Sequence, residues 1–593
     1  MIVTEKMRRL GTALAPLLLA LMAPALAAAE SQPPVRLGFV HASKGLLTLA
    51  AVALAVIVCT AGWRLFVPLE AKLERLARRR VLAMLTVGLL PLALRALLLP
   101  VMPAPEPQTH DEFSYLLAAD TFAHGRLTNP AHPMAVHFES MHILVRPSYA
   151  SMYPVAQGLM LAAGWRLFGH PWAGVWISIG LMGAAICWML QGWVSPGWAF
   201  LGATLAAMRL GIFSYWMNSY WGGAVAAFGG ALVLGALPRL LRKSSWRNAA
   251  WMGLGLAILA NSRPFEGLVF ALALAGVGFW KVARTPALWP ILLILAATGF
   301  GMLYYFHRVT GHSLVMPYVL NRQTMATAPL FIWQQPRPEP VYHHAVLRDF
   351  YAWELAVYSN VRSTPLLTNV LEKAHTYWRF FFGWLFTIPL VALPWLWKEH
   401  DARRLILAAA IFFFAALSLE VWQNPHYAAP ATGLFYLILT LAMQRLAGWT
   451  FRGAPAGLFL VRALLPACAL ILVANSLQGP SGPGSRWMRI AGKQEPASFG
   501  RAAVLHRLEA AGGRHLVVVR YEPGHNVHDE WVYNEAEIDA APVVWARDMG
   551  VAGNMELLQY FNSRQVWLAE PDLHPPRITP YRSAIEGTPR ALR

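Results

Sequence analysis

The sequence predicts an all-α polytopic membrane protein with about 12–13 transmembrane helices and a small C-terminal α/β domain. Three observations support this fold class. Of the 593 residues, 57% are hydrophobic and 13% are charged, which is about half the charged share of an average soluble domain. Apolar runs of near-span length recur from residue 10 to residue 477, and a polar segment with strand-like runs follows them. This composition excludes an ordinary water-soluble enzyme and a disordered chain.

The net charge of +19 comes from 49 basic and 30 acidic residues. The segment from Gln478 to Arg593 contains 13 of each sign, so the basic excess belongs to the apolar part, where it gathers in short connections between apolar runs. Such a distribution is typical of positive charge kept on the cytoplasmic side of a membrane. We therefore interpret the basic balance as a topology signal and expect no nucleic-acid partner.

Residues 1–30 have the character of a signal peptide or of a first transmembrane helix, because a basic start precedes an apolar run near 10–29. Either interpretation leaves residue 30 outside the cytoplasm. The next apolar run, near 45–63, leads into a connection at 64–80 in which arginine recurs. This connection is the strongest cytoplasmic signal in the chain.

The polytopic membrane domain is predicted to occupy residues 31–477. Its spans alternate in direction so that two long loops, 102–171 and 307–378, lie on the periplasmic face of a bacterial-type inner membrane. An odd number of spans carries the C-terminus to the same face. From residue 81 onward the predicted spans lie near 81–101, 172–191, 197–213, 219–241, 248–261, 266–281, 286–306, 379–397, 404–421, 431–448 and 456–477.

Within the first long loop, Val155–Phe168 is apolar but too short to span a membrane comfortably. We predict that it forms an interfacial helix lying against the membrane. Counting it as a span would move Arg239, Arg242 and Lys243 to the periplasmic face, against the positive-inside pattern.

The polar tail, 478–593, is predicted to form a small periplasmic domain after a Gly/Pro/Ser linker at Gly479–Gly484. A helix is expected at Arg501–Ala511, and a β-branched strand at His515–Tyr521. Val543–Trp545 and Gln565–Leu568 are further predicted strands. Together these elements indicate an α/β fold of roughly 100 residues, which is near the lower size limit for independent folding.

The sharpest local motif is a pair of adjacent carboxylates, Asp111 and Glu112, directly after an outward-crossing span. Two such charges at a membrane surface are unfavourable unless a cation, a ligand or water uses them. Successive helical side chains diverge by about 100°, so the two acids are expected to do different jobs. One can act as a base on a reacting hydroxyl. A purely structural interpretation, in which both acids complement a helix N-terminus, remains open.

The motif belongs to an ordered series of segments that covers roughly residues 81–450, and the span near 81–101 precedes it. The later members are Tyr153-Pro154 before the interfacial helix, Leu167-Phe168-Gly169 at its end, the stretch Gly-Leu-Ala-Ile-Leu-Ala-Asn-Ser-Arg-Pro at 255–264, and His426-Tyr427 followed by Pro430. The series resembles the GT-C glycosyltransferases, in particular the protein O-mannosyltransferase and aminoarabinose transferase type. The resemblance implies a GT-C-like fold for the membrane domain.

The resemblance also implies a reaction. A sugar would move from a polyprenyl-phosphate donor to an acceptor hydroxyl at the periplasmic face, with inversion. Asp111 matches the catalytic aspartate and would be the general base, while Glu112 would orient the acceptor or a cation. Arg263 matches a basic turn and would bind the leaving phosphate through its planar guanidinium. Relatives often place Lys before the Pro of the interfacial helix; Tyr153 stands there in this chain, so Arg146 is the candidate second phosphate ligand.

Several polar aromatic and amide side chains near the outer membrane boundary are candidate substrate-binding residues. In the segment 215–221 an aromatic belt at the membrane interface is the alternative interpretation to a stacking surface for a sugar ring. The candidates are Tyr115, Tyr153, Asn218, Tyr220, Trp221, His426 and Tyr427.

The sequence leads us to assign no metal ligands and no cofactor, although a divalent cation stays open as an option. Two groups of histidines have a metal-like composition, one with Glu139 in the first long loop and one at 525–530 in the tail. Their irregular spacing favours solvated or hydrogen-bonded loop histidines instead. The first group consists of His132, His137 and His142, and the second of His525 and His528.

The expected partners are the membrane, a polyprenyl-phosphate-linked sugar donor, and a lipid, glycan or protein acceptor. The alternative function is that of a multi-span lipid or glycan transporter or flippase, and a third is a non-catalytic scaffold that presents the tail. Transport paths usually place ionisable residues in the middle of spans. The predicted spans are nearly free of such residues, with Arg95 toward one end and Glu420 near an outer boundary, which favours the transferase.

Overall fold

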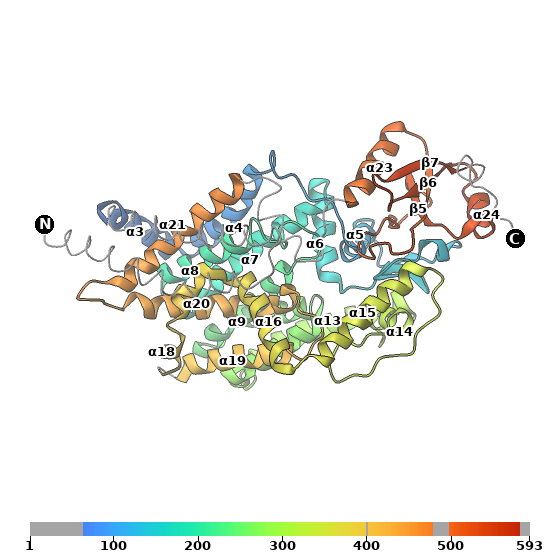
Figure 1. Cartoon of the computed structure of the whole chain (residues 1–593). Helices are drawn as coiled ribbons and strands as arrows, with labels where there is room; N and C mark the ends of the chain where they lie inside the picture. Colours follow the sequence, from blue (N-terminus) through green and yellow to red (C-terminus); the bar gives the residue numbers. More distant parts are fainter. Residues whose placement is uncertain (1–62, 399–400, 478–496, 582–593) are drawn as a thin grey trace.

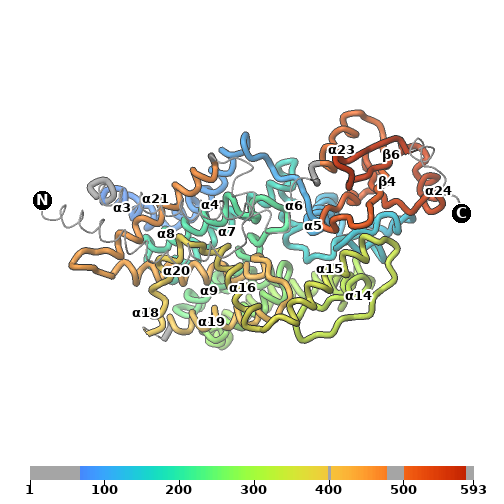
Figure 2. The backbone as a smooth tube through the Cα atoms, in the orientation of Figure 1, coloured from blue at the N-terminus to red at the C-terminus, as the bar shows by residue number. Residues whose placement is uncertain are grey.

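The structure is a computed structural model that describes residues 63–398, 401–477 and 497–581. The segment 1–30, the apolar run near 45–63 up to residue 62, and the Gly479–Gly484 linker lie outside the described residues. The molecule is elongated, with a helical part at one end and a small sheet domain at the other (Figure 1). The chain path in Figure 2 shows that α5, α14 and α15 lie at the junction between the two parts.

The helical part confirms a multi-pass membrane protein. Among the described residues, seven helices are long and apolar enough to cross a membrane, or eight if one bent pair is a single span. The seven are α4 (Arg80–Leu97), α7 (Trp172–Trp193), α9 (Ala224–Arg242), α11 (Pro264–Leu274) continued through η2 (Ala275–Phe279) and α12 (Trp280–Val282), α13 (Leu288–Thr310), η3 (Pro425–Ala431) continued by α20 (Thr432–Ala447), and α21 (Ala456–Leu477).

Three predicted spans form shorter helices, and a further helix precedes the first described span. The short helices are α8 (Pro196–Leu210), α10 (Trp246–Ala260) and α19 (Asp401–Leu417), and the preceding helix is α3 (Trp63–Arg78). Every apolar run predicted from residue 81 onward therefore contains helix. The predicted turn at Ser262–Pro264 is also present, because α10 ends at Ala260 and α11 begins at Pro264.

The predicted span at 379–397 is instead part of a sharply bent pair of helices. α16 (Leu366–Phe381) is followed by α17 (Gly383–Leu390) and α18 (Leu393–Lys398), with a bend of 100° at the break. Gly383 lies at this break with φ 58°, a left-handed conformation that glycine adopts without steric cost. The bend turns α16 toward the loops, so that part of the predicted loop 307–378 is helical.

The first long loop is a compact structure above the membrane helices. α5 (His110–Ala123) packs against a three-stranded antiparallel sheet of order β1-β3-β2. Its elements are β1 (Asn129–Pro130), η1 (Ala135–Phe138), β2 (Ile143–Leu144) and β3 (Ser148–Ser151). The helix predicted at the membrane interface, α6 (Val155–Phe168), has the expected bounds and ends at Gly169 in the left-handed conformation.

The second long loop contains two helices that apolar patterning alone does not reveal, α14 (Pro317–Met325) and α15 (Ala345–Ser363). Arg322 of α14 donates two hydrogen bonds to Glu354 of α15, at 2.9 and 2.7 Å, and both side chains are buried. A buried pair of this kind fixes the two helices against each other, because separating the partners would leave an uncompensated charge.

The tail has the predicted α/β character. Its four-stranded sheet has the order β5-β4-β6-β7, in which β4 runs parallel to β5 and β6, and β7 is antiparallel to β6. The three predicted strands are β4 (His515–Val519), β5 (Val543–Arg547) and β6 (Gln565–Glu570), and the predicted helix lies within α23 (Ala497–Ala511). The sequence did not indicate α24 (Gly550–Tyr560) or β7 (Arg577–Pro580).

The tail domain is seated on the first long loop. Leu117 and Phe138 of the loop share a hydrophobic cluster with Leu516 and Leu557 of the tail. Beside it, Arg547 donates to the backbone oxygen of Glu139 and pairs with Glu530 at 2.6 Å in a buried contact. The tail is therefore held in place over the loop that carries Asp111.

Candidate active site

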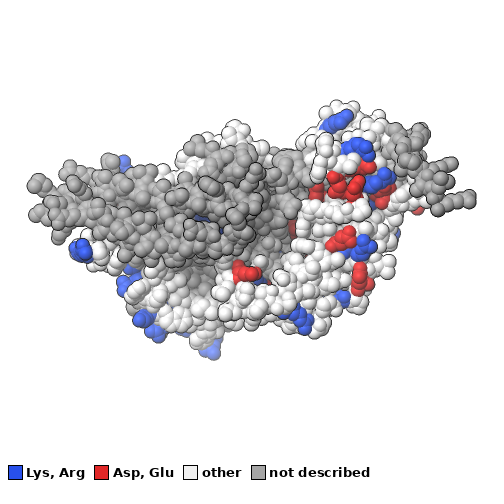
Figure 3. Space-filling view, viewed as in Figure 1, with Lys and Arg blue, Asp and Glu red and all other residues white. Residues whose placement is uncertain are grey.

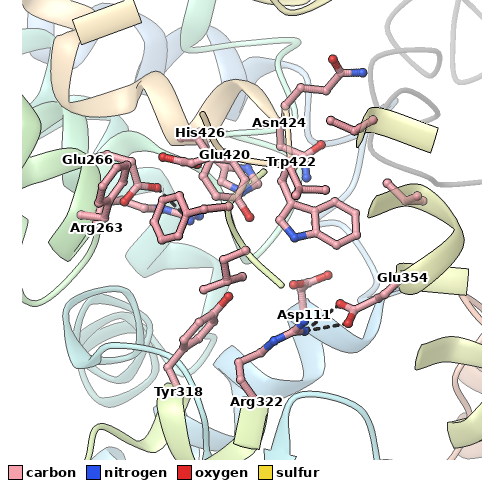
Figure 4. A pocket seen from close by; sticks show the side chains of 18 of the residues that line it. Asp111, Arg263, Glu266, Tyr318, Arg322, Glu354, Glu420, Trp422, Asn424 and His426 are labelled. Carbon is pink, nitrogen blue, oxygen red and sulfur yellow. Dashed lines mark hydrogen bonds and ion pairs between the residues drawn. The ribbon is translucent and has the colours of Figure 1, made fainter. Parts of the chain in front are cut away.

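A cavity of about 870 Å³ lies where both long loops, the ends of several membrane helices and the tail meet (Figure 4). It contains side chains from α5, from the turn between α10 and α11, from α14, α15 and α16, and from the segment that leads into η3. Of the residues proposed from sequence, seven line it: Asp111, Tyr115, Tyr153, Trp221, Arg263, His426 and Tyr427.

Asp111 lies at the first turn of α5 with 17% of its side chain exposed to the cavity. The Tyr153 hydroxyl donates to Asp111 Oδ1, and His142 Nδ1 lies 3.3 Å from the same oxygen. His142 Nδ1 is also 2.9 Å from the Tyr153 hydroxyl. On the other side, His110 Nε2 lies 3.7 Å from Asp111 Oδ2. The carboxylate is therefore enclosed by one phenol and two imidazoles.

The surroundings of Asp111 keep it ionised. Burial alone would raise the pKa of Asp111, but His142 and His110 beside it and the hydrogen bonds from His142 and Tyr153 bring that pKa well below its usual range. Burial lowers the pKa of His110 to about 3, so its imidazole is neutral near pH 7. The site thus presents a negative carboxylate next to a neutral histidine.

Glu112 does not line the cavity. Its side chain is fully buried and accepts hydrogen bonds from the backbone N–H groups of Gln108, Thr109 and Tyr220, at 2.9, 3.2 and 3.1 Å. It caps the N-terminus of α5 and ties that helix to the segment before α9. This placement supports the structural interpretation of Glu112 and not the expected role in orienting an acceptor.

The aromatic segment 211–223 is neither helical nor exposed to lipid. Tyr215, Trp216 and Tyr220 are buried in the protein core, which contradicts the interpretation as an aromatic belt. Asn218 is also buried and bonds to Arg95 Nε and to backbone oxygens. From this segment only Trp221 reaches the cavity, so neither Asn218 nor Tyr220 is placed to touch a ligand there.

Arg263 is one of the cations that line the cavity and lies at the turn before α11. Its guanidinium lies 4.7 Å from the centre of the Tyr427 ring and 3.6 Å from Glu266, and 17% of its side chain is exposed. None of its five N–H donors forms a hydrogen bond to another residue in the part of the chain that the structure describes. Arginine donors left over in a buried position are suited to an anion.

Arg146 is exposed at the surface and does not line the cavity, so the structure gives no second phosphate ligand at the position expected from sequence. Another cation is present instead. Lys373 of α16 is buried on the cavity and donates to the backbone oxygens of Leu417 and Glu420, at 2.8 and 2.7 Å. Lys373 lies in α16, ahead of the 100° bend.

The remaining polar wall of the cavity was not indicated by the sequence. Glu420 is buried, and its Oε1 has no hydrogen-bond partner among the described residues. Figure 4 shows that Arg322 and Glu354 pair at one side of the cavity while Arg263 and Glu266 lie at another. The cavity therefore contains several acids with their cations rather than one isolated pair.

Aromatic rings line the space between Asp111 and Arg263. Tyr115 stacks on Tyr153 with ring centres 4.4 Å apart, and His426 packs edge-on against Trp221 at 4.9 Å. The Tyr215 hydroxyl lies 2.9 Å from His426 Nδ1 and fixes that ring. Rigid aromatic faces with a few polar edges are typical of small-molecule sites.

The two histidine groups suggested by sequence are separated in space. His132 pairs with Asp539 at 3.0 Å, His137 bonds to the backbone oxygen of Arg547, and His525 pairs with Asp572 at 2.7 Å. His142 and His528 instead line the cavity. The spacing of the histidines in the sequence does not indicate these contacts, because the partner of each histidine comes from a distant part of the chain.

Several solved structures are similar to this chain. The oligosaccharyltransferase of Archaeoglobus fulgidus in complex with Zn and sulfate is 12% identical over 82% of this chain and 67% of that chain, with a TM-score of 0.44. ArnT from Cupriavidus metallidurans is similar in the apo state, with 13% identity and a TM-score of 0.45, and bound to undecaprenyl phosphate, with 11% identity and a TM-score of 0.45. Each ArnT match covers 81% of this chain and 92% of that chain.

No protein-family model matches the chain, and no curated protein matches it in sequence.

Proposed function

We propose that the chain is an integral-membrane glycosyltransferase that moves a sugar from a polyprenyl-phosphate donor to an acceptor hydroxyl at the periplasmic face. The observation that carries the proposal is the pairing of two groups on one cavity. Asp111 supplies an ionised carboxylate, and Arg263 supplies a buried guanidinium with unused donors. A transfer of this kind needs one base for the attacking hydroxyl and one cation for the leaving phosphate.

In the proposed reaction the acceptor oxygen attacks the anomeric carbon of the donor sugar. Its proton passes to Asp111 as the new carbon–oxygen bond forms. The bond from the anomeric carbon to the phosphate oxygen breaks, and polyprenyl phosphate leaves with the electron pair. Arg263 neutralises the charge that develops on this phosphate. A single displacement inverts the anomeric configuration.

The proposed sidedness places the cavity and the tail at the periplasmic face. α18 and the turn between α20 and α21 lie at the end of the helical part away from the tail (Figure 1). On the face drawn in Figure 3, Lys and Arg side chains lie along the helical part with few acidic neighbours, whereas acids and bases mix at the tail end. This distribution agrees with a cytoplasmic location for the basic end.

A lipid or glycan transporter is the second candidate, and one observation favours it. Glu266 and Lys373 are buried charges within membrane-domain helices and line the cavity, which transport paths commonly show. A transporter, however, needs no ionised base beside a binding site for a leaving phosphate. The two candidates differ in whether a covalent sugar transfer occurs.

The leaving-phosphate site is tested with the full chain in membranes and labelled polyprenyl-phosphate sugars. Arg263→Gln is expected to lower the rate of label transfer by about 10²–10³-fold, the usual cost of removing one donor to a developing oxyanion. Arg348→Gln is the matched control, because Arg348 is exposed on α15 outside the cavity. Equal transfer by Arg263→Gln and by the control would contradict the assignment of the phosphate site.

A further inference from the structure

We infer that His110, Asp111 and His142 form a binding site for a divalent cation of the zinc class at the edge of the cavity. The inference goes beyond the proposed sugar transfer but uses the same carboxylate: one oxygen of Asp111 would bind the cation, and the other would stay available to the acceptor hydroxyl. Each of the three residues offers one ligand atom, and these atoms all lie within 4.8 Å of one another. Sequence spacing did not suggest the set, since His142 comes from a loop beside β2 that folds back onto α5.

The separations fit a small metal ion. Asp111 lies 3.3 Å from His142 Nδ1 and 3.7 Å from His110 Nε2. Zinc–nitrogen and zinc–oxygen bonds of 2.0–2.2 Å in a tetrahedral site require ligand atoms roughly 3.3 Å apart. These two distances involve Oδ1 and Oδ2 of Asp111 respectively, and the three ligand atoms lie within 4.8 Å of one another. The side chains would therefore move closer together to bind one ion.

His110 is buried beside Asp111, and neither of its ring nitrogens forms a hydrogen bond to another described residue. Buried polar atoms of proteins are usually hydrogen-bonded, so an imidazole without such a bond needs an explanation. Nε2 faces Asp111 Oδ2 at 3.7 Å. A cation bound at Nε2 would give this nitrogen a partner that the described residues do not provide.

The backbone at His142 is held in an unusual conformation. Its φ is 62°, which is a left-handed conformation that non-glycine residues rarely adopt. Its carbonyl oxygen accepts hydrogen bonds from Ser114 Oγ at 2.7 Å and from the Met152 N–H at 3.2 Å. Strained backbone of this kind gathers at functional sites, where the surrounding structure holds a side chain in position.

Tyr153 contacts two of the three proposed ligands without being a ligand itself. Its hydroxyl donates to Asp111 and lies 2.9 Å from His142 Nδ1, so one side chain orients two of the three ligands. A ring nitrogen or carboxylate oxygen that binds a cation carries no proton there, so metal binding competes with protons at these ligands.

The donor set selects the class of metal. Two imidazole nitrogens and one carboxylate oxygen suit zinc, cobalt or iron better than magnesium or calcium, which prefer oxygen ligands. Three protein ligands leave at least one position free for water or substrate. His528 of the tail lies nearby, with its ring centre 5.8 Å from that of His110, and would border this open position.

The test uses the full chain in detergent after chelator treatment, with Co²⁺ and Zn²⁺ as the probes. Equilibrium dialysis and the visible spectrum of bound Co²⁺ are expected to show a single tight equivalent in the wild type. His110→Asn and His142→Asn should each weaken binding by at least the roughly 10–100-fold that loss of an outer-shell partner costs. The matched control is His312→Asn, the same change at an exposed histidine, which should bind as the wild type does.

Thermal unfolding with and without Zn²⁺ gives a second readout that does not depend on activity. Zn²⁺ should raise the melting temperature of the wild type and of His312→Asn, but not that of His110→Asn or His142→Asn. No bound metal in the wild type, or equal binding by all variants, would overturn the inference. A chain that transfers sugar without binding metal refutes this inference alone, whereas a chain that binds metal without transferring sugar refutes the proposed function alone.

Discussion

Asp111 and Glu112 show how two adjacent residues of one chemical type acquire different roles. A helical step of about 100° turns one carboxylate toward the cavity and the other into the protein. Glu112 is fully buried and accepts backbone N–H groups, whereas Asp111 is partly open to the cavity beside His142 and Tyr153. The sequence shows that the two acids diverge, but which one meets a ligand depends on the elements packed around them.

The hydroxyl of Tyr153 is expected to contribute to the acid limit of activity. After His142 and His110, it helps hold the pKa of Asp111 below its usual range, so the carboxylate proposed as the base is ionised near neutral pH and is protonated only as the pH falls through that low value. Tyr153→Phe removes one donor to the carboxylate and raises its pKa. The acid limb of kcat/KM against pH should therefore move to higher pH than in the wild type. An unmoved acid limb would show that this hydroxyl does not tune the base.

At the scale of elements, the sequence predicts best where local signals coincide. The bounds of α6 follow from Tyr153-Pro154 at its start and Gly169 at its end, and β4 follows from its β-branched run. α14 and α15 could not be predicted in this way, because their positions depend on the buried pair of Arg322 and Glu354.

The bend between α16 and α17 is a second feature that the apolar pattern hides. Apolar residues continue through the break, and only Gly383 marks it. Its left-handed backbone lies beside Arg209, whose guanidinium is fixed by the backbone oxygens of Arg379 and Phe380.

Gly383→Ala is expected to destabilise the protein. A Cβ at Gly383 would lie 2.9 Å from Arg209 Nη2, and the φ of 58° would become strained; the cost should be about 1–2 kcal/mol. Gly299→Ala is the matched control, because Gly299 lies within α13 with nothing in contact with the added methyl group. Thermal unfolding in detergent measures both, and equal melting temperatures would contradict the account of the bend.

At the scale of the whole molecule, the cavity combines residues from distant parts of the chain. Asp111, Arg263, Tyr115 and Tyr427 could be proposed from sequence because each belongs to a segment of the ordered series. Lys373 and His528 could not, because residue 373 was expected in a loop and His528 reaches the cavity only through the docking of the tail. The sequence therefore predicts the cavity residues of the ordered series better than the rest of the cavity wall.

The proposed sidedness makes a prediction about chemical labelling. Arg348→Cys places a thiol on α15 beside the tail, and Lys243→Cys places one in the connection between α9 and α10; both positions are exposed. Of the native cysteines in the described residues, Cys187 and Cys468 are buried. In intact spheroplasts an impermeant thiol reagent should label Arg348→Cys, whereas Lys243→Cys should react only after the membrane is opened. The reverse pattern would place the cavity in the cytoplasm.

The central claim is that Asp111 accepts the acceptor proton during sugar transfer from a polyprenyl-phosphate donor. The most direct measurement compares label transfer by the wild type, Asp111→Asn and Asp349→Asn in membranes, with equal amounts of correctly inserted protein. Asp349 is exposed on α15 outside the cavity, so its variant controls for the same chemical change. Asp111→Asn should lose about 10²–10⁴-fold in rate while Asp349→Asn keeps the wild-type rate. Wild-type transfer by Asp111→Asn would contradict the account.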